Sequence, residues 1–282
     1  MNKRTNILIV GLGLIGGSYA KGLTKNGFHV FGLDISEKTI EYALKNQIIE
    51  KGFTSSKPEI YENIDMIIIG LYPDKIVDYI QNNQQYFKAN TFISDVAGIK
   101  CSYIYEIKKI LRKDLIYIPH HPMAGLQLSG IENSDEKIFE GMNFIITPDE
   151  FDTKENIDTL YDLANILKFK NVNVLDVKTH DQMITYLSQL THVIAISLMT
   201  EKDSTHFIKY TGDSFRDLTR IATINENMWS KLFLENRQLL IPEIDLFIDQ
   251  IENIKQTLID NDEEKLKQIM ILSTQRRKKF DE

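Results

Sequence analysis

Cysteine is nearly absent from this chain of 282 residues, which contains only Cys101. A single cysteine excludes an intramolecular disulfide and a cysteine-based zinc site, and we expect no metal site. Absence of disulfides is typical of a reducing compartment. The apolar stretch near the N-terminus contains four glycines and no cleavage-like site, unlike a signal peptide. We therefore expect a cytoplasmic protein.

Positive charge is also in deficit. The chain has 33 Lys and Arg against 40 Asp and Glu, which gives a net charge of -7. Nucleic acid and anionic membrane surfaces both require a basic face, so neither is expected as the main partner. No run reaches the roughly 18 apolar residues of a membrane span. A small anionic metabolite stays compatible with this composition if a few cations converge locally.

Glycine and proline are scarce in the second part of the chain, which has only Gly212 and Pro242 after residue 178. Residues 180–202, 214–224, 226–256 and 261–280 have helical periodicity, and no strand pattern is found there. The sequence therefore predicts an all-helical domain over 178–282. Apolar excess on several of these helices favours a homodimer formed through this domain.

Residues 1–177 show the opposite pattern, in which short apolar runs alternate with amphipathic segments. Strands are predicted over 6–10, 28–34, 65–71, 90–95, 115–120, 143–148 and 172–177. Helices are predicted over 14–26, 36–47, 74–87, 101–111 and 153–168, with Ser36 as an N-cap. This alternation indicates βαβ units and a parallel sheet. The fold class is thus α/β, with an N-terminal Rossmann-type, mostly parallel sheet followed by the helical domain.

A glycine fingerprint lies between the first predicted strand and helix. Its three glycines are Gly11, Gly13 and Gly16, and Leu14 and Ile15 stand between the last two. The glycines permit a tight turn, close approach of a pyrophosphate and close helix–strand packing. The helix N-terminus attracts the phosphate. A glycine-rich turn that binds no nucleotide is the alternative interpretation.

The expected acidic residue follows 18 positions after the last glycine of this fingerprint. Asp34 ends the second predicted strand, where its carboxylate can accept both ribose hydroxyls and repel a 2′-phosphate. NAD is therefore the predicted cofactor, in preference to NADP. Ser94 and Asp95, at the end of a later strand, are further candidates to line the nicotinamide. Asp95 is alternatively an N-cap of the next helix.

Several motifs together resemble the prephenate/arogenate dehydrogenase family. In chain order they are GLGLIGGS (11–18), SDVAGIK (94–100), HPMAG (121–125), SGIENS (129–134), FEGMNFIITP (139–148), THD (179–181) and FRDLTRIA (215–222). The resemblance covers almost the whole chain and implies a Rossmann-type domain, a dimerising helical domain and an active site between them. It also implies oxidative decarboxylation of prephenate to 4-hydroxyphenylpyruvate with NAD.

The resemblance assigns roles to three side chains. His121 corresponds to the catalytic histidine, and imidazole suits that task because it accepts a proton near neutral pH. Arg220 corresponds to the arginine that binds a substrate carboxylate, for which guanidinium offers paired donors. His192 corresponds to a second histidine that contacts the substrate. The alternatives are a loop histidine that caps backbone, an arginine paired with Asp217 and a structural histidine. His120, His180 and Asp181 are interpreted as structural.

This chain departs from the family pattern at four positions. Gln189 and Thr191 stand in SQLTH, where the family commonly has SHLPH. Gly98 replaces a serine that lies beside the catalytic histidine, which predicts weaker orientation of His121 without loss of activity. Leu126 replaces a polar residue after HPxAG. These changes do not alter the predicted reaction class, but they affect the substrate preference.

Three other functions compete with this interpretation. Arogenate differs from prephenate only in an amino group, and no residue in the sequence visibly recognises that group. A β-hydroxyacid dehydrogenase or imine reductase would commonly place a catalytic lysine on the interdomain helix, but residues 181–197 contain none. A non-catalytic NAD sensor or structural dimer would bind nucleotide without turnover.

Overall fold

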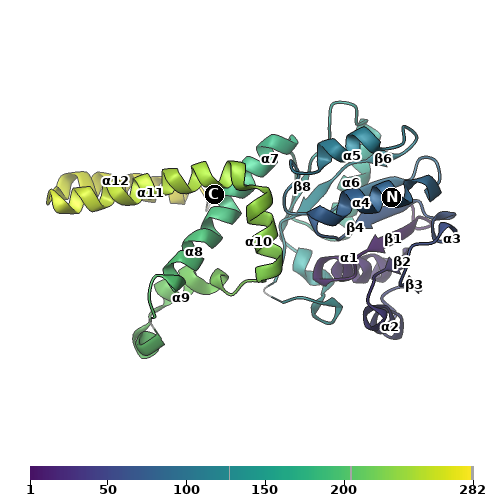
Figure 1. The fold of residues 1–282 in the computed structure, drawn as a ribbon, viewed down its shortest axis with the longest axis horizontal. Helices are drawn as coiled ribbons and strands as arrows, with labels where there is room; N and C mark the ends of the chain where they lie inside the picture. The colour runs from purple at the N-terminus through teal and green to yellow at the C-terminus, as the bar shows by residue number, and fades with distance from the viewer. Residues whose placement is uncertain (127, 204, 281–282) are drawn as a thin grey trace. The chain divides into compact units, whose positions relative to one another are not determined.

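The computed structural model describes residues 1–126, 128–203 and 205–280. The chain forms two compact units, Met1–Asn236 and Arg237–Glu282, and each is described by itself (Figure 1). The first unit contains both sheets and the helices up to α10. The second consists of α11 and α12.

The first unit is built on a six-stranded parallel sheet. Its strands are β1 (Asn6–Val10), β2 (His29–Leu33), β3 (Lys51–Phe53), β4 (Met66–Ile69), β5 (Phe92–Asp95) and β6 (Ile116–Tyr117). Their order is β3-β2-β1-β4-β5-β6, with every pair parallel. The order reverses direction between β1 and β4, the point where such sheets bind ligands. The predicted Rossmann-type sheet is thus confirmed.

Helices follow most of these strands and cover the sheet. They are α1 (Leu14–Lys25), α2 (Glu37–Lys45), α3 (Pro58–Tyr61), α4 (Pro73–Asn83), α5 (Ile104–Ile110) and α6 (Lys154–Ile166). Three short 3₁₀ turns complete them: η1 (Gln84–Tyr86), η2 (Ile131–Asn133) and η3 (Glu136–Phe139). Ser36 caps α2 as predicted, because its side chain accepts a hydrogen bond from the Thr39 backbone N–H. The strand β3 and helix α3 were not predicted, since three or four residues are too few to show periodicity.

The strand predicted over 115–120 is wrong in its extent. The parallel sheet ends with Tyr117, and the chain then enters a second, three-stranded sheet of β7 (His120–Pro122), β8 (Asn143–Ile146) and β9 (Asn171–Val174). Pro119 separates the two sheets, and proline has no N–H to continue a ladder. In the second sheet β7 is antiparallel to β8, and β9 is parallel to it.

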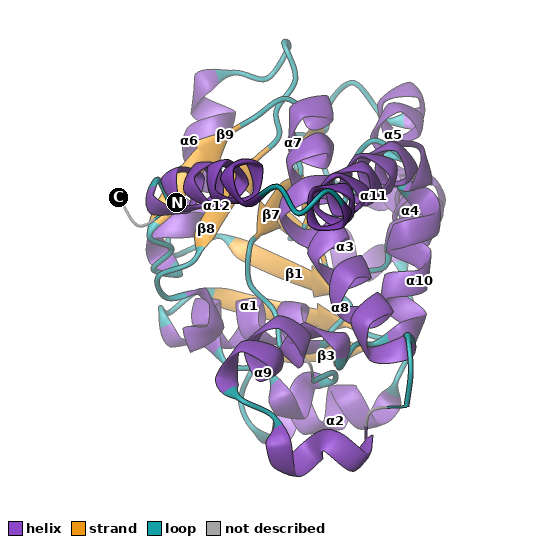
Figure 2. Cartoon of the chain, turned by 90° about the vertical axis from the view of Figure 1, so that its left-hand side faces the viewer, coloured by secondary structure: helices purple, strands orange, loops and turns teal. Residues whose placement is uncertain are grey.

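The two faces of the large sheet have separate cores. Ile7 and Ile9 of β1 pack in the cluster that contains α1 and α6, whereas Leu8 and Val10 pack in the cluster that contains α4 and α5. All four side chains are buried. Alternate residues of a strand point to opposite faces, so a continuous apolar run is what a strand covered on both faces requires. The orange strands of Figure 2 accordingly lie among helices.

A helical part of the first unit follows the sheets. It comprises α7 (Val177–Ile184), the π-helical turn η4 (Thr185–Gln189), α8 (Leu190–Thr200), η5 (Thr205–Tyr210), α9 (Asp213–Thr219), η6 (Arg220–Ala222) and α10 (Glu226–Glu235). Val177–Thr200 is long and apolar enough to cross a membrane by length and composition alone. Its buried polar residues include His180, Asp181 and Thr185, which bond to other protein groups. These polar bonds join the first half of the segment to the rest of this unit.

The second unit is a hairpin of α11 (Arg237–Ile259) and α12 (Glu263–Lys278). The single helix predicted over 226–256 is therefore wrong, because it ends at Glu235 and α11 starts at Arg237. Asn236 separates them and donates from Nδ2 to Thr185 Oγ1 (2.8 Å) and Gln189 Oε1 (2.6 Å). The hairpin exposes many apolar side chains: Ile241, Leu246, Ile248, Ile251, Leu258, Ile259, Met270, Ile271 and Leu272. An exposed apolar surface of this extent is typical of a protein interface.

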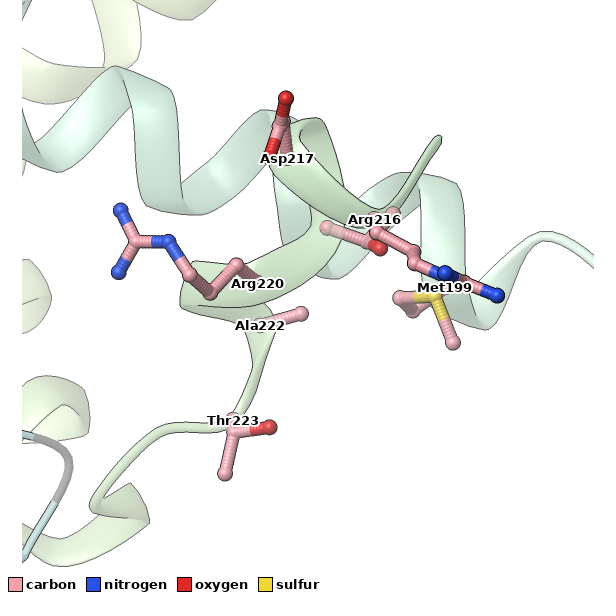
Figure 3. Close-up of a pocket in the computed structure, with 7 residues that line it drawn as sticks. Met199, Arg216, Asp217, Arg220, Ala222 and Thr223 are labelled. Atoms are coloured by element: carbon pink, nitrogen blue, oxygen red, sulfur yellow. The ribbon is translucent and has the colours of Figure 1, made fainter. Parts of the chain in front are cut away.

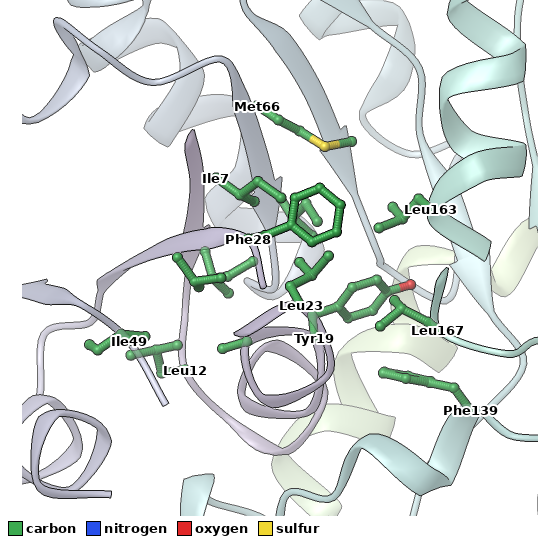
Figure 4. Packing of buried hydrophobic residues seen from close by; sticks show 14 of the residues in the cluster. Ile7, Leu12, Tyr19, Leu23, Phe28, Ile49, Met66, Phe139, Leu163 and Leu167 are labelled. Atoms are coloured by element: carbon green, nitrogen blue, oxygen red, sulfur yellow. The ribbon is translucent and has the colours of Figure 1, made fainter. Parts of the chain in front are cut away.

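A buried polar contact crosses the core beneath α1. Tyr19 is fully buried, its ring 4.7 Å from that of Phe139 and close to Leu167 in Figure 4. Its hydroxyl lies 2.7 Å from His120 Nε2, and His120 Nδ1 lies 2.6 Å from Ser94 Oγ. Ser94 donates to the Ile118 carbonyl, so His120 donates from Nδ1 and accepts from Tyr19 at Nε2.

Replacing Tyr19 by phenylalanine is expected to lower the free energy of unfolding by about 1–3 kcal/mol, because it leaves the buried His120 Nε2 without a donor. Urea unfolding followed by circular dichroism measures this change. The control is Tyr105→Phe, since the Tyr105 side chain is exposed and should change little. Equal stability of the two variants would contradict the assigned role of the Tyr19 hydroxyl.

Candidate active site

The glycine turn between β1 and α1 has the geometry of a dinucleotide cradle. Gly11 has φ +85°, and a Cβ there would lie 2.7 Å from the Gly70 carbonyl oxygen after β4. A Cβ at Gly16 would lie 1.9 Å from the Gly11 carbonyl oxygen. A Cβ at Gly13, in contrast, would have no atom within 4 Å among the described residues other than its neighbours in the chain. The turn is therefore closely packed on its protein side and open at Gly13, where a pyrophosphate would approach.

The residues around this opening also fit a dinucleotide. Leu14 and Ile15 are partly exposed in the first turn of α1, where helical N–H groups have no intrahelical acceptor. Asp34 accepts hydrogen bonds from the backbone N–H of Leu12 (2.8 Å) and Ser36 (2.9 Å). Because each carboxylate oxygen can accept more than one donor, Asp34 is held in place and can still accept ribose hydroxyls.

Ser94 and Asp95 lie at the end of β5, and contacts with other protein groups occupy their side chains. Both are fully buried. Asp95 accepts from Lys100 Nζ (2.7 Å) and from the hydroxyls of Tyr103 and Tyr117 (2.6 Å each). The alternative prediction, that Asp95 is the N-cap of the next helix, is wrong, since α5 begins only after Tyr103. The sequence shows that Asp95 ends a strand but not which neighbours surround it.

The two histidines of β7 point in different directions. His120 is fully buried, whereas His121 is partly exposed although protein atoms crowd its ring. Burial lowers the pKa of His120, and the Lys100 ammonium lowers it further. Burial also lowers the pKa of His121 well below its usual value, with added repulsion from His180, Lys100 and His120. His121 is therefore a neutral imidazole at physiological pH, as a proton acceptor must be.

His121 is hydrogen-bonded to His180, which is bonded in turn to Asp181, and the sequence predicts only a structural role for both. Its Nδ1 lies 3.0 Å from His180 Nε2, and His180 Nδ1 lies 2.6 Å from Asp181 Oδ1. All three belong to the first unit, His121 on β7 and the other two on α7. The adjacent pair in THD (179–181) was the available signal, but sequence spacing does not bring α7 to β7.

The other nitrogen of His121 faces Gly98. A Cβ at Gly98 would lie 3.7 Å from His121 Nε2 and 3.8 Å from Cε1, and apart from its chain neighbours no other atom of the described residues would lie within 4 Å. Gly98 and His121 are thus neighbours, as the sequence predicts. Because glycine has no side chain, the loop at Gly98 leaves space beside Nε2.

His192 lies on α8, one turn after the π-helical segment. Its ring stacks on Trp229 of α10 with centroids 3.7 Å apart. Its Nδ1 lies 2.9 Å from the Ser188 carbonyl oxygen, so Nδ1 carries the proton and Nε2 is an acceptor. Burial lowers the pKa of His192, which keeps the ring neutral. The bond to Ser188 therefore fixes which nitrogen His192 presents, and the Trp229 ring packs on one face of the imidazole.

Arg220 begins η6 and lines a cavity of about 540 Å³. The lining residues are Met199, Arg216, Asp217, Thr219, Arg220, Ala222 and Thr223. Figure 3 shows the guanidinium of Arg220 directed away from Arg216 and Met199. The segment packs on α8, which also carries His192. Within the described residues this lining includes neither His121 nor His192, so the structure of one chain does not unite all three predicted substrate residues.

Comparison with known proteins identifies the family. The family model of the "Prephenate dehydrogenase, nucleotide-binding domain" matches residues 19–173 of the chain. The family model of the "Prephenate dehydrogenase, dimerization domain" matches residues 176–272. The chain belongs to the prephenate dehydrogenase family. It is accordingly an oxidoreductase. The glycine fingerprint lies outside the first match, so it supports nucleotide binding independently.

Individual relatives agree with this family. The chain is 28% identical over 272 residues to "Prephenate dehydrogenase" of Bacillus subtilis, covering 93% of this chain and 72% of the relative. It is 25% identical over 265 residues to "Cyclohexadienyl dehydrogenase" of Zymomonas mobilis, covering 91% and 89%. A crystal structure of prephenate dehydrogenase from A. aeolicus, in complex with hydroxyphenyl propionate and NAD+, superposes with a TM-score of 0.89. That protein is 26% identical, and 99% of each chain is covered.

Two of the site's buried histidines should make stability depend on pH. Burial lowers the pKa of both His120 and His180 in the folded protein, whereas histidine in an unfolded chain titrates near 6.5. Below pH 6.5 the unfolded chain therefore binds more protons, and stability is lost as the pH falls towards the folded pKa values.

We expect the free energy of unfolding to fall by roughly 1–3 kcal/mol between pH 7.5 and pH 5.5, to which each histidine contributes at most about 1.4 kcal/mol. Urea titrations at the two pH values measure this difference. Equal stability at both would show that these histidines bind protons as easily in the folded protein as in the unfolded chain.

Proposed function

We propose that this enzyme oxidises and decarboxylates prephenate to 4-hydroxyphenylpyruvate in tyrosine biosynthesis, with His121 as the proton acceptor. The observation that carries this proposal is the environment of His121. Its pKa is lowered, its Nδ1 is engaged by His180, and its Nε2 faces the space left by Gly98. A neutral imidazole with one free nitrogen suits a substrate hydroxyl.

The reaction joins three bond changes. His121 Nε2 accepts the proton of the C4 hydroxyl as the hydrogen on C4 leaves with two electrons. The bond from the ring to its carboxylate breaks, CO₂ is released, and that electron pair makes the ring aromatic. His121 then returns the proton to the phenolate oxygen. The proton is thus held transiently, and the products are 4-hydroxyphenylpyruvate, CO₂ and the reduced cofactor.

The cofactor is NAD, which accepts the hydride. Gly11, Gly13 and Gly16 form its pyrophosphate cradle, and the backbone of Leu14 and Ile15 contributes donors at the α1 N-terminus. Asp34 binds the ribose hydroxyls, and its negative charge disfavours the 2′-phosphate of NADP.

Arg220 and His192 bind the substrate. The guanidinium of Arg220 is exposed at a cavity and supplies paired donors for a carboxylate. His192 contacts the substrate through Nε2, because its Nδ1 proton is held by the Ser188 carbonyl. The exposed side chain of Leu126 contributes no polar contact.

We further infer a homodimer in the cytoplasm, with a nucleotide-binding domain over 1–177 and a dimerisation domain over 178–282. The exposed apolar side chains of α11 and α12 and the family's "dimerization domain" at 176–272 support the dimer. The boundary between 177 and 178 lies close to the gap between the two family matches.

Arogenate is the second candidate substrate. The name of the Zymomonas mobilis relative, "Cyclohexadienyl dehydrogenase", covers the class to which prephenate and arogenate belong. The two compounds share the ring on which His121 acts and differ only in the side chain. The alternative β-hydroxyacid dehydrogenase lacks support from α8, which carries no lysine.

The proposal predicts that purified protein reduces NAD+ in the presence of prephenate, which absorbance at 340 nm measures. His121→Asn should lower kcat by about 10²–10⁴-fold with little change in KM, because the proton acceptor is lost while binding contacts remain. Parallel assays with arogenate and with NADP+ give the preferences. No reduced cofactor with either substrate would refute the proposed function.

Arg220→Ala should raise the KM for prephenate by about 10–100-fold with a smaller effect on kcat, since a hydrogen bond to a charged group contributes about 1.5–3 kcal/mol. Arg216→Ala is the matched control, because Arg216 lines the same cavity and lies 3.9 Å from Asp213. Arg220 is not the carboxylate ligand if its variant keeps the original KM.

A further inference from the structure

The hydrogen bonds around His121 form a directed chain that ends in a carboxylate. Asp181 Oδ1 lies 2.6 Å from His180 Nδ1, and His180 Nε2 lies 3.0 Å from His121 Nδ1. The two imidazole rings meet edge to face, with centroids 5.2 Å apart. His180 and Asp181 are almost completely buried. Protein atoms therefore shield the bond between His180 and Asp181 from water.

Asp181 determines which group donates and which accepts in this series of hydrogen bonds. It also accepts hydrogen bonds from the backbone N–H of Lys100 (2.9 Å) and Cys101 (2.6 Å). Burial acts to raise the pKa of Asp181, but the hydrogen bonds from His180 and Cys101 outweigh it and the pKa falls below its usual value. The carboxylate is thus ionised and can only accept.

The protonation of both histidines follows from this acceptor. His180 must carry its proton on Nδ1 to donate to Asp181, which leaves Nε2 as a lone pair in the neutral ring. His121 must then carry its proton on Nδ1 to donate to His180. The remaining lone pair of His121 is on Nε2, the nitrogen that faces Gly98.

The charged and titratable groups that surround His121 come from three elements. His120 is its neighbour on β7, Lys100 belongs to the segment after β5, and His180 and Asp181 belong to α7. The Lys100 ammonium is paired with Asp95 at 2.7 Å. Asp181 is therefore the anion that reaches His121 through a hydrogen bond of His180.

We propose that Asp181 and His180 are positioning residues, which set the tautomer of His121 so that Nε2 accepts the substrate proton. This inference rests on the proposed function. When Nε2 takes the hydroxyl proton, the O–H bond breaks, an N–H bond forms, and His121 becomes an imidazolium. Its Nδ1–H bond to His180 then strengthens, and the Asp181 carboxylate stabilises the positive charge.

The first test is Asp181→Asn. The amide oxygen can still accept from the Cys101 N–H, and the amide nitrogen then donates to His180 Nδ1. This reverses both tautomers and places the proton of His121 on Nε2. We expect kcat to fall about 10²–10⁴-fold with KM nearly unchanged. We also expect the acid limb of kcat/KM to move to lower pH, because loss of the anion disfavours the imidazolium.

Two further variants separate positioning from a loss of folding. His180→Gln can present its amide oxygen to His121 Nδ1 and keep the original tautomer, so its kcat should lie between wild type and Asp181→Asn. Asp176→Asn is the matched control on the same helix. Asp176 caps α7 by accepting from the Thr179 N–H, and asparagine caps equally well. This control should retain wild-type kcat and pH dependence.

Nitrogen NMR of ¹⁵N-histidine-labelled protein measures the tautomer without turnover. His121 should be protonated at Nδ1 in the wild type and at Nε2 in Asp181→Asn. The proposal is overturned if His121 has the same tautomer in both, or if folded Asp181→Asn keeps the kcat and pH profile of an active wild type. If the wild type turns over neither substrate, the proposed function fails, and the NMR result still decides whether Asp181 sets the tautomer.

Discussion

The carboxylate of Asp181 is the constraint on which the geometry of the site depends. It joins three segments that are distant in sequence, because it accepts from the backbone at Lys100 and Cys101 and from His180, which in turn contacts His121 on β7. The loop after β5, the start of the helical part and the second sheet are thereby held in one arrangement. A buried anion with several donors is stable only when all of them are in place.

The adjacent histidines of β7, His120 and His121, lie in different environments, and only His121 has a nitrogen available to a substrate. His120 faces the core, where Tyr19 and Ser94 satisfy both of its nitrogens. His121 faces the other side, where one nitrogen is engaged and the other is open towards Gly98. The alternation of side chains along a strand makes this division possible. Burial keeps both rings neutral.

At the cofactor cradle and at His192, too, contacts within the protein leave particular atoms accessible. At Gly11 and Gly16 the backbone is packed so closely that only glycine fits, and the open position at Gly13 is left for a ligand. At His192, the Ser188 carbonyl and the Trp229 ring leave Nε2 as the accessible nitrogen. In each case protein contacts determine which atoms are free to meet the substrate or cofactor.

The sequence by itself determined the α/β class, the glycine cradle, Asp34 and the helical second half, because local periodicity and turn chemistry express these features. Only the tertiary structure decided that Tyr117 ends one sheet and His120 begins another, and that Ser94 and Asp95 are buried. It also decided that His180, which is bonded to Asp181, meets His121, 59 residues away in sequence. The reason is physical: periodicity reports which side of an element is buried, whereas hydrogen bonds between distant elements depend on how those elements pack.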